Sequence, residues 1–323
     1  MYDYFMEKFV YQMFILGSGE YLKQALEKGL GGVIFFTPDI KSEEQFKTLI
    51  QNVKQESLIP PFLSIDQEGG RVERTENIRP KRLSARYAFE KGEEFLVSQT
   101  QEIASELKEY GINLNFAPVA DVNTNPDNPI IGERAFSDNP DEVIRGVNLV
   151  SNVYRSNGII PCIKHYPGHG DANADSHKTL PKIDLSMEYM EKIHIKPFRN
   201  AVENNIEMVM AAHLHCSCFD KETIPASLSK NAIGYLRNTL KYDGVVISDD
   251  MVMKGVQAYG SFEAVKMGIE AGLDMFIFRN ADKNAFETIE KLVRSAENDK
   301  TLAEKIIKSN DRIQKLKNKY CIL

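Results

Sequence analysis

The sequence predicts an α/β protein built as a (β/α)8 TIM-type barrel, and two observations carry this prediction. Short apolar runs recur eight times along the 323 residues, and polar loops and amphipathic stretches lie between them. Short, continuous β-branched runs are typical of strands buried on both faces of a parallel sheet. Eight strands that alternate with helices favour a closed barrel over an open doubly wound sheet. The expected strands are 12–17, 32–36, 61–66, 112–121, 159–164, 208–214, 244–249 and 274–278.

The segments between these runs have the pattern of helices. Three glycines, Gly111, Gly158 and Gly272, come directly after expected helices, where a left-handed residue is favoured. No low-complexity linker or internal repeat divides the chain, so residues 1–323 are expected to form one domain. The expected helices are 42–55, 90–110, 141–157, 187–205, 230–241, 261–271, 284–298 and 302–320.

The composition narrows the class of protein. An apolar content of 42% is enough for a large core, and the net charge of −6 argues against nucleic acid and anionic membranes as partners. No run of 18 apolar residues marks a membrane span, and residues 1–8 carry acids where a signal peptide carries bases. The four cysteines, at 162, 216, 218 and 321, do not make a disulfide framework in a chain this long. A cytoplasmic protein is expected.

The segment 164–177 (KHYPGHGDANADSH) concentrates proton carriers directly after an expected strand. A polar surface loop, a metal site and acid/base catalysis are the three interpretations of such a segment. His165 and His169 stand four residues apart, which on a helix would place both on one face. Pro167 and Gly168 lie between them and break a helix, so this spacing does not indicate a metal site.

Polar residues also follow several other expected strands. Active sites of (β/α)8 barrels lie at the C-terminal ends of the strands, so these residues are expected to meet at one rim. A single acid there could simply cap a helix, but several acids and bases together indicate a functional site. The run 213–218 (HLHCSC) also suggests a metal, although four-ligand sites usually spread their ligands over separate segments. The strand-end residues are Asp66, Asp121, Lys164, His165, His213, His215, Asp249 and Asp250.

Five motifs in order give a family resemblance: DQEGGRVER (66–74), NFAPVADVNTNP (115–126), GERAF (132–136), KHYPGHGDANADSHKTLP (164–181) and VISDDMVMKGV (246–256). Together they resemble glycoside hydrolase family 3, and specifically its bacterial β-N-acetylhexosaminidase (NagZ-type) branch. The resemblance extends from Lys8 to Lys319. It implies a retaining exo-glycosidase without metal or cofactor. This enzyme would remove terminal β-linked N-acetylglucosamine from muropeptides, in peptidoglycan recycling, or from chito-oligosaccharides.

The resemblance also implies roles for individual residues. Asp249 matches the nucleophile that forms a glycosyl-enzyme, and the adjacent Asp250 is its competitor. Successive strand residues face opposite ways, so only one of the two is expected to point into the barrel mouth. His177 matches the acid/base, and Asp175 would orient its ring and favour its charged form. The residues that match the sugar-binding positions are Asp66, Arg74, Arg134, Lys164 and His165.

Some features leave alternatives open. Ala172 stands where the family commonly has threonine. Arg71 and Asp121 suit structural roles at the rim. His213 could equally be a structural histidine whose hydrogen bonds are satisfied at a strand end. A β-glucosidase, β-xylosidase or β-N-acetylglucosaminide phosphorylase on the same barrel is the alternative activity. The phosphorylase stays open because a histidine acid/base leaves no carboxylate to repel phosphate. A non-catalytic sugar-binding protein and a metal-dependent hydrolase are further alternatives. The expected partner is a small carbohydrate, and the chain is expected to be a monomer or a weak homo-oligomer.

Overall fold

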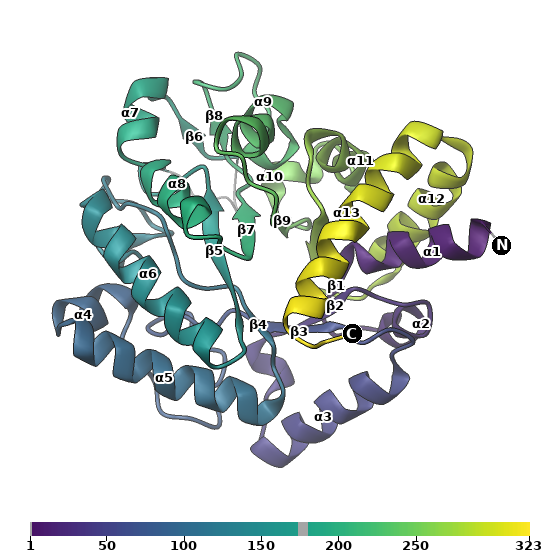
Figure 1. Ribbon diagram of the computed structural model, residues 1–323, viewed down its shortest axis with the longest axis horizontal. Helices are drawn as coiled ribbons and strands as arrows, with labels where there is room; N and C mark the ends of the chain where they lie inside the picture. Colours follow the sequence, from purple (N-terminus) through teal and green to yellow (C-terminus); the bar gives the residue numbers. More distant parts are fainter. Residues whose placement is uncertain (1, 174–179) are drawn as a thin grey trace.

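The central feature of the molecule is a closed barrel of eight parallel strands (Figure 1). The computed structural model describes residues 2–173 and 180–323. Each expected apolar run overlaps one barrel strand, so the predicted (β/α)8 barrel is confirmed. Around the barrel the order is β1 (Phe14–Leu16), β10 (Met275–Phe278), β9 (Val245–Asp250), β7 (Met208–Ala211), β5 (Ile160–Tyr166), β4 (Leu114–Asn115), β3 (Phe62–Ile65) and β2 (Gly32–Phe35).

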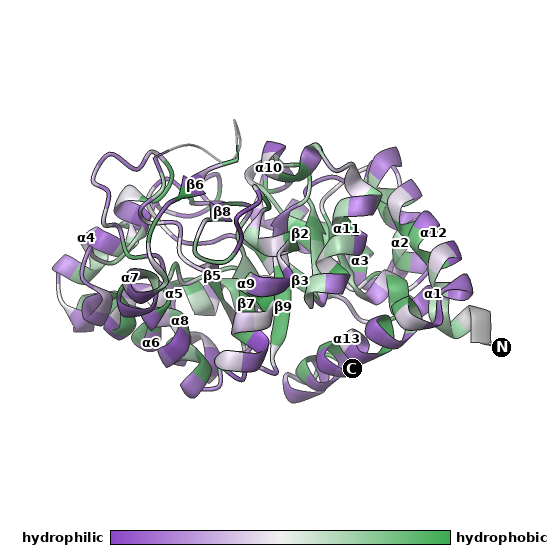
Figure 2. Ribbon diagram, turned by 90° about the horizontal axis from the view of Figure 1, so that it is seen from above, coloured by the Kyte–Doolittle hydropathy of each residue, from purple (hydrophilic) through white to green (hydrophobic). Residues whose placement is uncertain are grey.

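The barrel strands are largely buried and mostly apolar, and β4, β5 and β9 carry polar residues towards the rim, whereas the surrounding helices carry hydrophilic residues on their outer sides (Figure 2). This division follows from the sequence, because a parallel sheet covered by helices removes both faces of each strand from water. Close contacts between strands also require glycine at some positions. A Cβ on Gly32 of β2 would lie 2.9 Å from the Phe62 carbonyl oxygen of β3.

The helices surround the barrel and begin at capping side chains. Ser42, Asn139 and Asp282 each accept a hydrogen bond from a backbone N–H in the first helical turn. Gly111 and Gly272 have positive φ values of 84° and 116°, as predicted for helix C-termini. Within the described ranges, no helix has the length and apolar character of a membrane span. The helices are α1 (Tyr2–Gln12), α2 (Leu22–Glu27), α3 (Glu43–Glu56), α4 (Ala85–Glu90), α5 (Glu93–Tyr110), α6 (Pro140–Ser156), α7 (Met187–Lys192), α8 (Lys196–Glu203), α9 (Lys230–Gly234), α10 (Lys254–Gln257), α11 (Ser261–Ala271), α12 (Lys283–Asn298) and α13 (Lys300–Lys319).

Several local expectations need correction. The expected helix 187–205 is two helices, α7 and α8, because Pro197 lies in the first turn of α8, where proline favours a new start. The expected helix 230–241 is α9 followed by a π-helical turn. The apolar run 112–121 forms only the two-residue strand β4, since Pro118 has no N–H to donate to a ladder. Helix α1 was not expected from the sequence and packs against α12 and α13 (Figure 1).

A small second sheet was also not expected. Strand β6 (Lys182–Ile183) pairs in parallel with β8 (His215–Cys216) outside the barrel. Two-residue strands are too short to leave a hydrophobic period in the sequence. Through this sheet, residues 182–183, which follow the 164–177 segment, pair with residues 215–216 of the HLHCSC run.

Two register shifts in the barrel fall next to its polar rim. On β5, Ile163 pairs with Val209 and Tyr166 pairs with Ala211, so β5 accommodates one extra residue. On β9, Ile247 pairs with Met275 and Asp250 pairs with Ile277, which again leaves one extra residue. Such bulges re-aim side chains at barrel rims. The extra residues lie within 164–165 and 248–249.

Candidate active site

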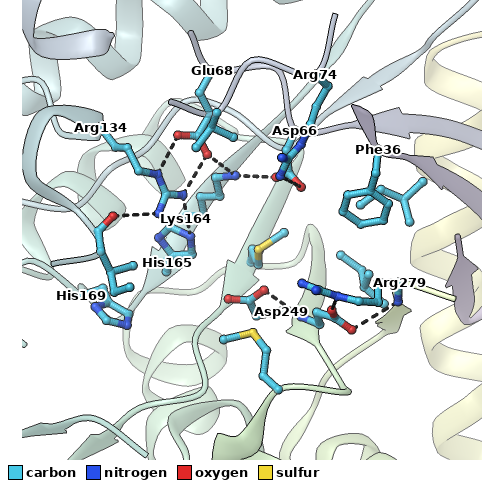
Figure 3. A pocket seen from close by; sticks show the side chains of 17 residues that line it. Phe36, Asp66, Glu68, Arg74, Arg134, Lys164, His165, His169, Asp249 and Arg279 are labelled. Atoms are coloured by element: carbon cyan, nitrogen blue, oxygen red, sulfur yellow. Dashed lines mark hydrogen bonds and ion pairs between the residues drawn. The ribbon is translucent and has the colours of Figure 1, made fainter. Parts of the chain in front are cut away.

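A pocket opens at the C-terminal ends of the barrel strands, and charged side chains dominate its wall (Figure 3). The loops and strand ends after β2, β3, β5, β9 and β10 all contribute to it. The structure therefore brings together Asp249 and all five residues that match the sugar-binding positions. The charged and imidazole side chains that line the pocket are Asp66, Glu68, Arg74, Arg134, Lys164, His165, His169, Asp249, Asp250 and Arg279.

Lys164 links two carboxylates at the centre of this wall. Its Nζ lies 2.6 Å from Asp66 Oδ1 and 2.6 Å from Glu68 Oε1, and the side chain is buried. Burial by itself would lower the pKa of Lys164, but Asp66 and Glu68 raise it above its ordinary value. The ammonium group therefore stays charged and fixes both carboxylates.

Glu68 is held from its other side by Arg134. The guanidinium binds it through two bonds, with Nε 2.8 Å from Oε2 and Nη2 2.9 Å from Oε1. Burial would raise the pKa of Glu68, but Arg134 and Lys164 together lower it far below its ordinary value. Glu68 is thus an ionised anchor. An ionised, doubly paired carboxylate is a poor proton donor, so Glu68 does not suit the role of the acid/base.

Asp121 holds His165 from beneath the pocket. Its Oδ2 lies 2.7 Å from His165 Nδ1, and its Oδ1 accepts the backbone N–H groups of His165 at 3.3 Å and His169 at 2.6 Å. Arg134 Nη2 lies 3.4 Å from His165 Nε2. The tautomer with the proton on Nδ1 satisfies both ring contacts. Lys164 and His165, which both line the pocket, are joined by a cis peptide bond.

The long loop 123–140 is tied to the pocket by two arginines. Arg71 donates to the carbonyl oxygens of Pro129, at 3.0 Å, and of Ile130. Arg134 Nη1 also donates to the Ile130 carbonyl, at 3.1 Å. These contacts give Arg71 the structural position that its sequence context indicated.

Asp249 lies at the base of the pocket in a cationic environment (Figure 3). Its Oδ1 accepts the Asp250 backbone N–H at 2.7 Å. Burial would raise the pKa of Asp249, but His165, His213, the Asp250 N–H and Lys164 hold it below its ordinary value. An ionised carboxylate at this position has the charge state that a nucleophile requires.

Asp250 also lines the pocket, so the expectation that only one of the two aspartates would do so is wrong. The register shift on β9 is the reason, because it interrupts the alternation of side chains. The Asp250 carboxylate is engaged elsewhere. It forms an ion pair with Arg279 Nε and accepts the backbone N–H groups of Val252 and Arg279, both at 3.2 Å.

The HLHCSC run does not gather ligands for a metal. His213 Nδ1 lies 2.7 Å from Ser227 Oγ, and its Nε2 lies 3.1 Å from the Asp249 carbonyl oxygen. His215 Nδ1 lies 3.2 Å from the Ile224 carbonyl oxygen. Among the residues that the structure describes, no three His, Cys, Asp or Glu side chains are placed to hold a metal ion. His213 instead supports the backbone of Asp249.

The acid/base pair expected from the resemblance, His177 and Asp175, lies outside the described residues. The chain just before it is anchored to the loop after β4, because Asp171 Oδ1 accepts the Thr124 hydroxyl at 2.9 Å. Ala172 is buried in a small apolar cluster with Ile183 and Leu214.

Sequence reasoning did not predict Phe36 and Arg279 as residues of the pocket, and it considered His169 only within the 164–177 segment and as a metal ligand. Phe36 and Arg279 each directly follow a barrel strand, so the rule of strand-end residues could have found them. Both ring nitrogens of His169 are buried without a hydrogen-bond partner in the described structure. Burial lowers the pKa of His169 to about 4, which leaves its ring neutral at physiological pH.

Comparison with known proteins agrees with this geometry. The family model described as the glycosyl hydrolase family 3 N-terminal domain matches residues 10–316. The chain belongs to glycosyl hydrolase family 3. The family resemblance seen in the motifs is therefore confirmed.

Relatives within glycosyl hydrolase family 3 have similar sequences and folds. "Beta-hexosaminidase A" of Pseudoalteromonas piscicida is 31% identical in an alignment of 319 residues, and this alignment covers 90% of this chain but only 53% of that protein. The chain thus spans about half the length of this relative. "Beta-hexosaminidase" of Photobacterium profundum is 34% identical over 269 residues, 81% of this chain and 78% of the relative. A solved family 3 β-N-acetylglucosaminidase from Paenibacillus sp. str. FPU-7 superposes with a TM-score of 0.92 at 30% identity, and covers 98% of this chain and 62% of its own.

Proposed function

We propose that the chain is a retaining exo-β-N-acetylglucosaminidase that removes terminal β-linked N-acetylglucosamine. The observation that carries the proposal is the ionised Asp249 at the base of a pocket walled by paired charged groups. The names of the family 3 relatives, two β-hexosaminidases and one β-N-acetylglucosaminidase, support the same activity. Muropeptides and chito-oligosaccharides are the proposed natural substrates, and a cytoplasmic location stays a prediction from the sequence.

The proposed reaction has two steps. Asp249 attacks the anomeric carbon, the glycosidic bond breaks, and His177 donates a proton to the leaving oxygen. In the second step His177 takes a proton from water, which attacks the same carbon and breaks the bond to Asp249. Two inversions at one carbon retain the β configuration. Asp175 would orient the His177 ring and stabilise its charged form, as a carboxylate does for a catalytic histidine.

The pocket supports the binding part of this proposal because its polar groups are held in place before a sugar arrives. Lys164 fixes the carboxylates of Asp66 and Glu68, while Asp121 fixes the ring of His165. Sugar hydroxyls need charged acceptors and directional donors, which Asp66, Arg74 and Arg134 supply. Such preorganised groups lose little freedom when substrate binds.

A panel of nitrophenyl β-glycosides tests this proposal against its alternatives. We expect the N-acetylglucosaminide to have a kcat/KM at least about tenfold above those of the glucoside and xyloside, because a site built for one polar substituent discriminates against its absence. Each rate is measured with and without inorganic phosphate. Faster turnover of the plain glucoside or xyloside would contradict the assignment, and N-acetylglucosamine 1-phosphate as the product would identify a phosphorylase instead. Release of disaccharides from chito-oligosaccharides would contradict exo-action.

Exhaustive chelation is expected to leave the activity unchanged. His165 and His213, which lower the pKa of Asp249, already have protein partners: Asp121 and Arg134 contact His165, and Ser227 contacts His213. The measurement is the kcat/KM after treatment with EDTA and gel filtration, with a zinc enzyme treated in parallel as a control. Activity that disappears and returns with zinc or manganese would favour a metal-dependent hydrolase.

A further inference from the structure

A recess lies next to the pocket, and Arg74 is the one residue of its lining to which the proposal above gives a role. It shares Phe36, Arg74 and Arg279 with the pocket, so the two are continuous. A group projecting from a sugar in the pocket therefore has this recess next to it. The other residues that line the recess include Ser18, Thr37 and Asp39.

Two guanidinium groups flank one aromatic ring in this recess. The Cζ atom of Arg74 lies 5.5 Å from the centre of the Phe36 ring, and that of Arg279 lies 5.9 Å from it. At these distances the π face of the ring attracts both cations and limits their movement. Phe36 thus helps to hold the two arginines at the mouth (Figure 3).

Arg279 is also fixed through its backbone and through Asp250. Its N–H donates to Asp250 Oδ1 at 3.2 Å, and its Nε pairs with Asp250 Oδ2. The carbonyl oxygen of Arg279 packs so closely on β1 that a Cβ on Gly17 would lie 1.8 Å from it. The backbone and the Nε of Arg279 are therefore held at the end of β10, while 43% of its side chain stays exposed.

Both arginines have N–H groups that the described residues leave unused. Within residues 2–173 and 180–323, the two terminal nitrogens of Arg279 have no hydrogen-bond partner, because its pair with Asp250 uses Nε. The Nε of Arg74 is buried without a partner in the same ranges, and its Nη2 is 3.8 Å from Asp66 Oδ2. Guanidinium N–H groups bind oxyanions most strongly, often through two parallel bonds.

The neighbouring carboxylates already have partners of their own. Asp66 binds Lys164, Asp250 binds Arg279, and Asp39 Oδ2 accepts the Phe36 N–H at 2.8 Å. Their negative charges offset the positive charges of Lys164 and the two arginines. Its open donors are nevertheless the arginine N–H groups, so the ligand that fits is an acceptor with several oxygens.

We propose that Phe36, Arg74 and Arg279 form an oxyanion subsite beside the sugar pocket, and that Arg279 makes the enzyme prefer substrates with an anionic substituent. The proposal rests on the proposed glycosidase function. The oxyanion has two possible sources with the same chemistry. One is a carboxylate on the part of the substrate outside the pocket, and the other is free inorganic phosphate.

The test compares two substrates that differ in charge and by one methyl group. N-acetylglucosamine β-linked to N-acetylmuramic acid carries a lactyl carboxylate, which methyl esterification neutralises. For the wild type we expect a kcat/KM about tenfold higher on the acid than on the ester, as for a charge-assisted hydrogen bond. The ratio should fall to about one in Arg279→Gln and stay intermediate in Arg279→Lys, which keeps the charge but loses the fork.

Removal of the Arg279 guanidinium leaves Asp250 unpaired and could lower kcat/KM on both substrates. The acid-to-ester ratio within each variant cancels such a shared loss. Arg145→Gln is the matched control, because Arg145 is an exposed arginine that pairs with Glu93 and does not line the pocket or the recess. Its ratio should equal that of the wild type.

A second arm identifies the source of the oxyanion. Inorganic phosphate is added to the neutral nitrophenyl substrate at constant ionic strength, in the wild type and in Arg279→Gln. Phosphate-dependent acceleration that requires Arg279, with N-acetylglucosamine 1-phosphate as product, would assign the subsite to phosphate. There a phosphate oxygen would bond to the anomeric carbon while the bond from that carbon to Asp249 breaks and its electron pair returns to the carboxylate.

The subsite is overturned if the wild type turns over acid and ester equally and phosphate has no effect on either enzyme. It is also overturned if the preference for the acid persists in Arg279→Gln. Failure of the underlying function has a different signature, because neither N-acetylglucosamine nor its 1-phosphate would then be released from any of these substrates.

Discussion

Replacing Asp249 by alanine is expected to lower kcat/KM by about 10⁴-fold or more on every substrate. Loss of the nucleophile removes the covalent path, and single removals of such groups cost this much or more in other hydrolases. The charged wall built by Lys164 does not depend on Asp249, so the variant should still bind substrate. Steady-state kinetics with nitrophenyl N-acetylglucosaminide give the loss, and calorimetric titration of substrate into the inactive variant measures the retained binding.

Asp250→Asn is the matched control for this experiment. Asp250 contacts Arg279 and the Val252 N–H, so its loss should disturb the rim and cost about tenfold, well short of the Asp249 effect. A 2-fluoro sugar that traps the glycosyl-enzyme should label Asp249, as located by peptide mass spectrometry. A label on any other carboxylate would show that the nucleophile has been assigned wrongly.

The effect of His177→Ala is expected to depend on the leaving group. A nitrophenolate leaves readily as an anion, so formation of the glycosyl-enzyme should slow only modestly with that substrate. A sugar alkoxide leaves poorly, and general-acid help there is worth about 10²–10⁴-fold. Parallel kinetics on the nitrophenyl substrate and on a natural disaccharide measure the difference. The deglycosylation step should slow as well, so the variant is expected to show a burst.

Azide provides the control for the role of His177. It attacks the glycosyl-enzyme without needing deprotonation, so it should restore turnover and give a β-glycosyl azide. Asp175→Ala should weaken the same steps less, because Asp175 orients the ring and transfers no proton itself. Equal losses on good and poor leaving groups, without azide rescue, would leave His177 as a binding residue. The acid/base would then be sought at Asp171 or Asp175, since Glu68 is ionised and doubly paired.

The family and the barrel were predictable from the sequence because both are determined by local signals. Short apolar runs between amphipathic segments indicate a parallel sheet covered by helices, and every such run overlaps a barrel strand. Glycine at helix ends has an equally local cause, as Gly111 and Gly272 show. The rule that barrel sites lie at strand ends then selected Asp66, Lys164 and Asp249 as neighbours in space.

Only the tertiary structure decided how these residues are paired and which way they face. The contact between Lys164 and Asp66 joins residues 98 positions apart, so no local pattern predicts it. Asp249 and Asp250 both line the pocket because β9 shifts its register against β10, and register depends on packing between neighbouring strands. The place of Arg279 beside Phe36 likewise requires the closed barrel, in which β10 and β2 lie on either side of β1. The sequence by itself determined which residues reach the rim, and the geometry of the closed barrel determined their partners.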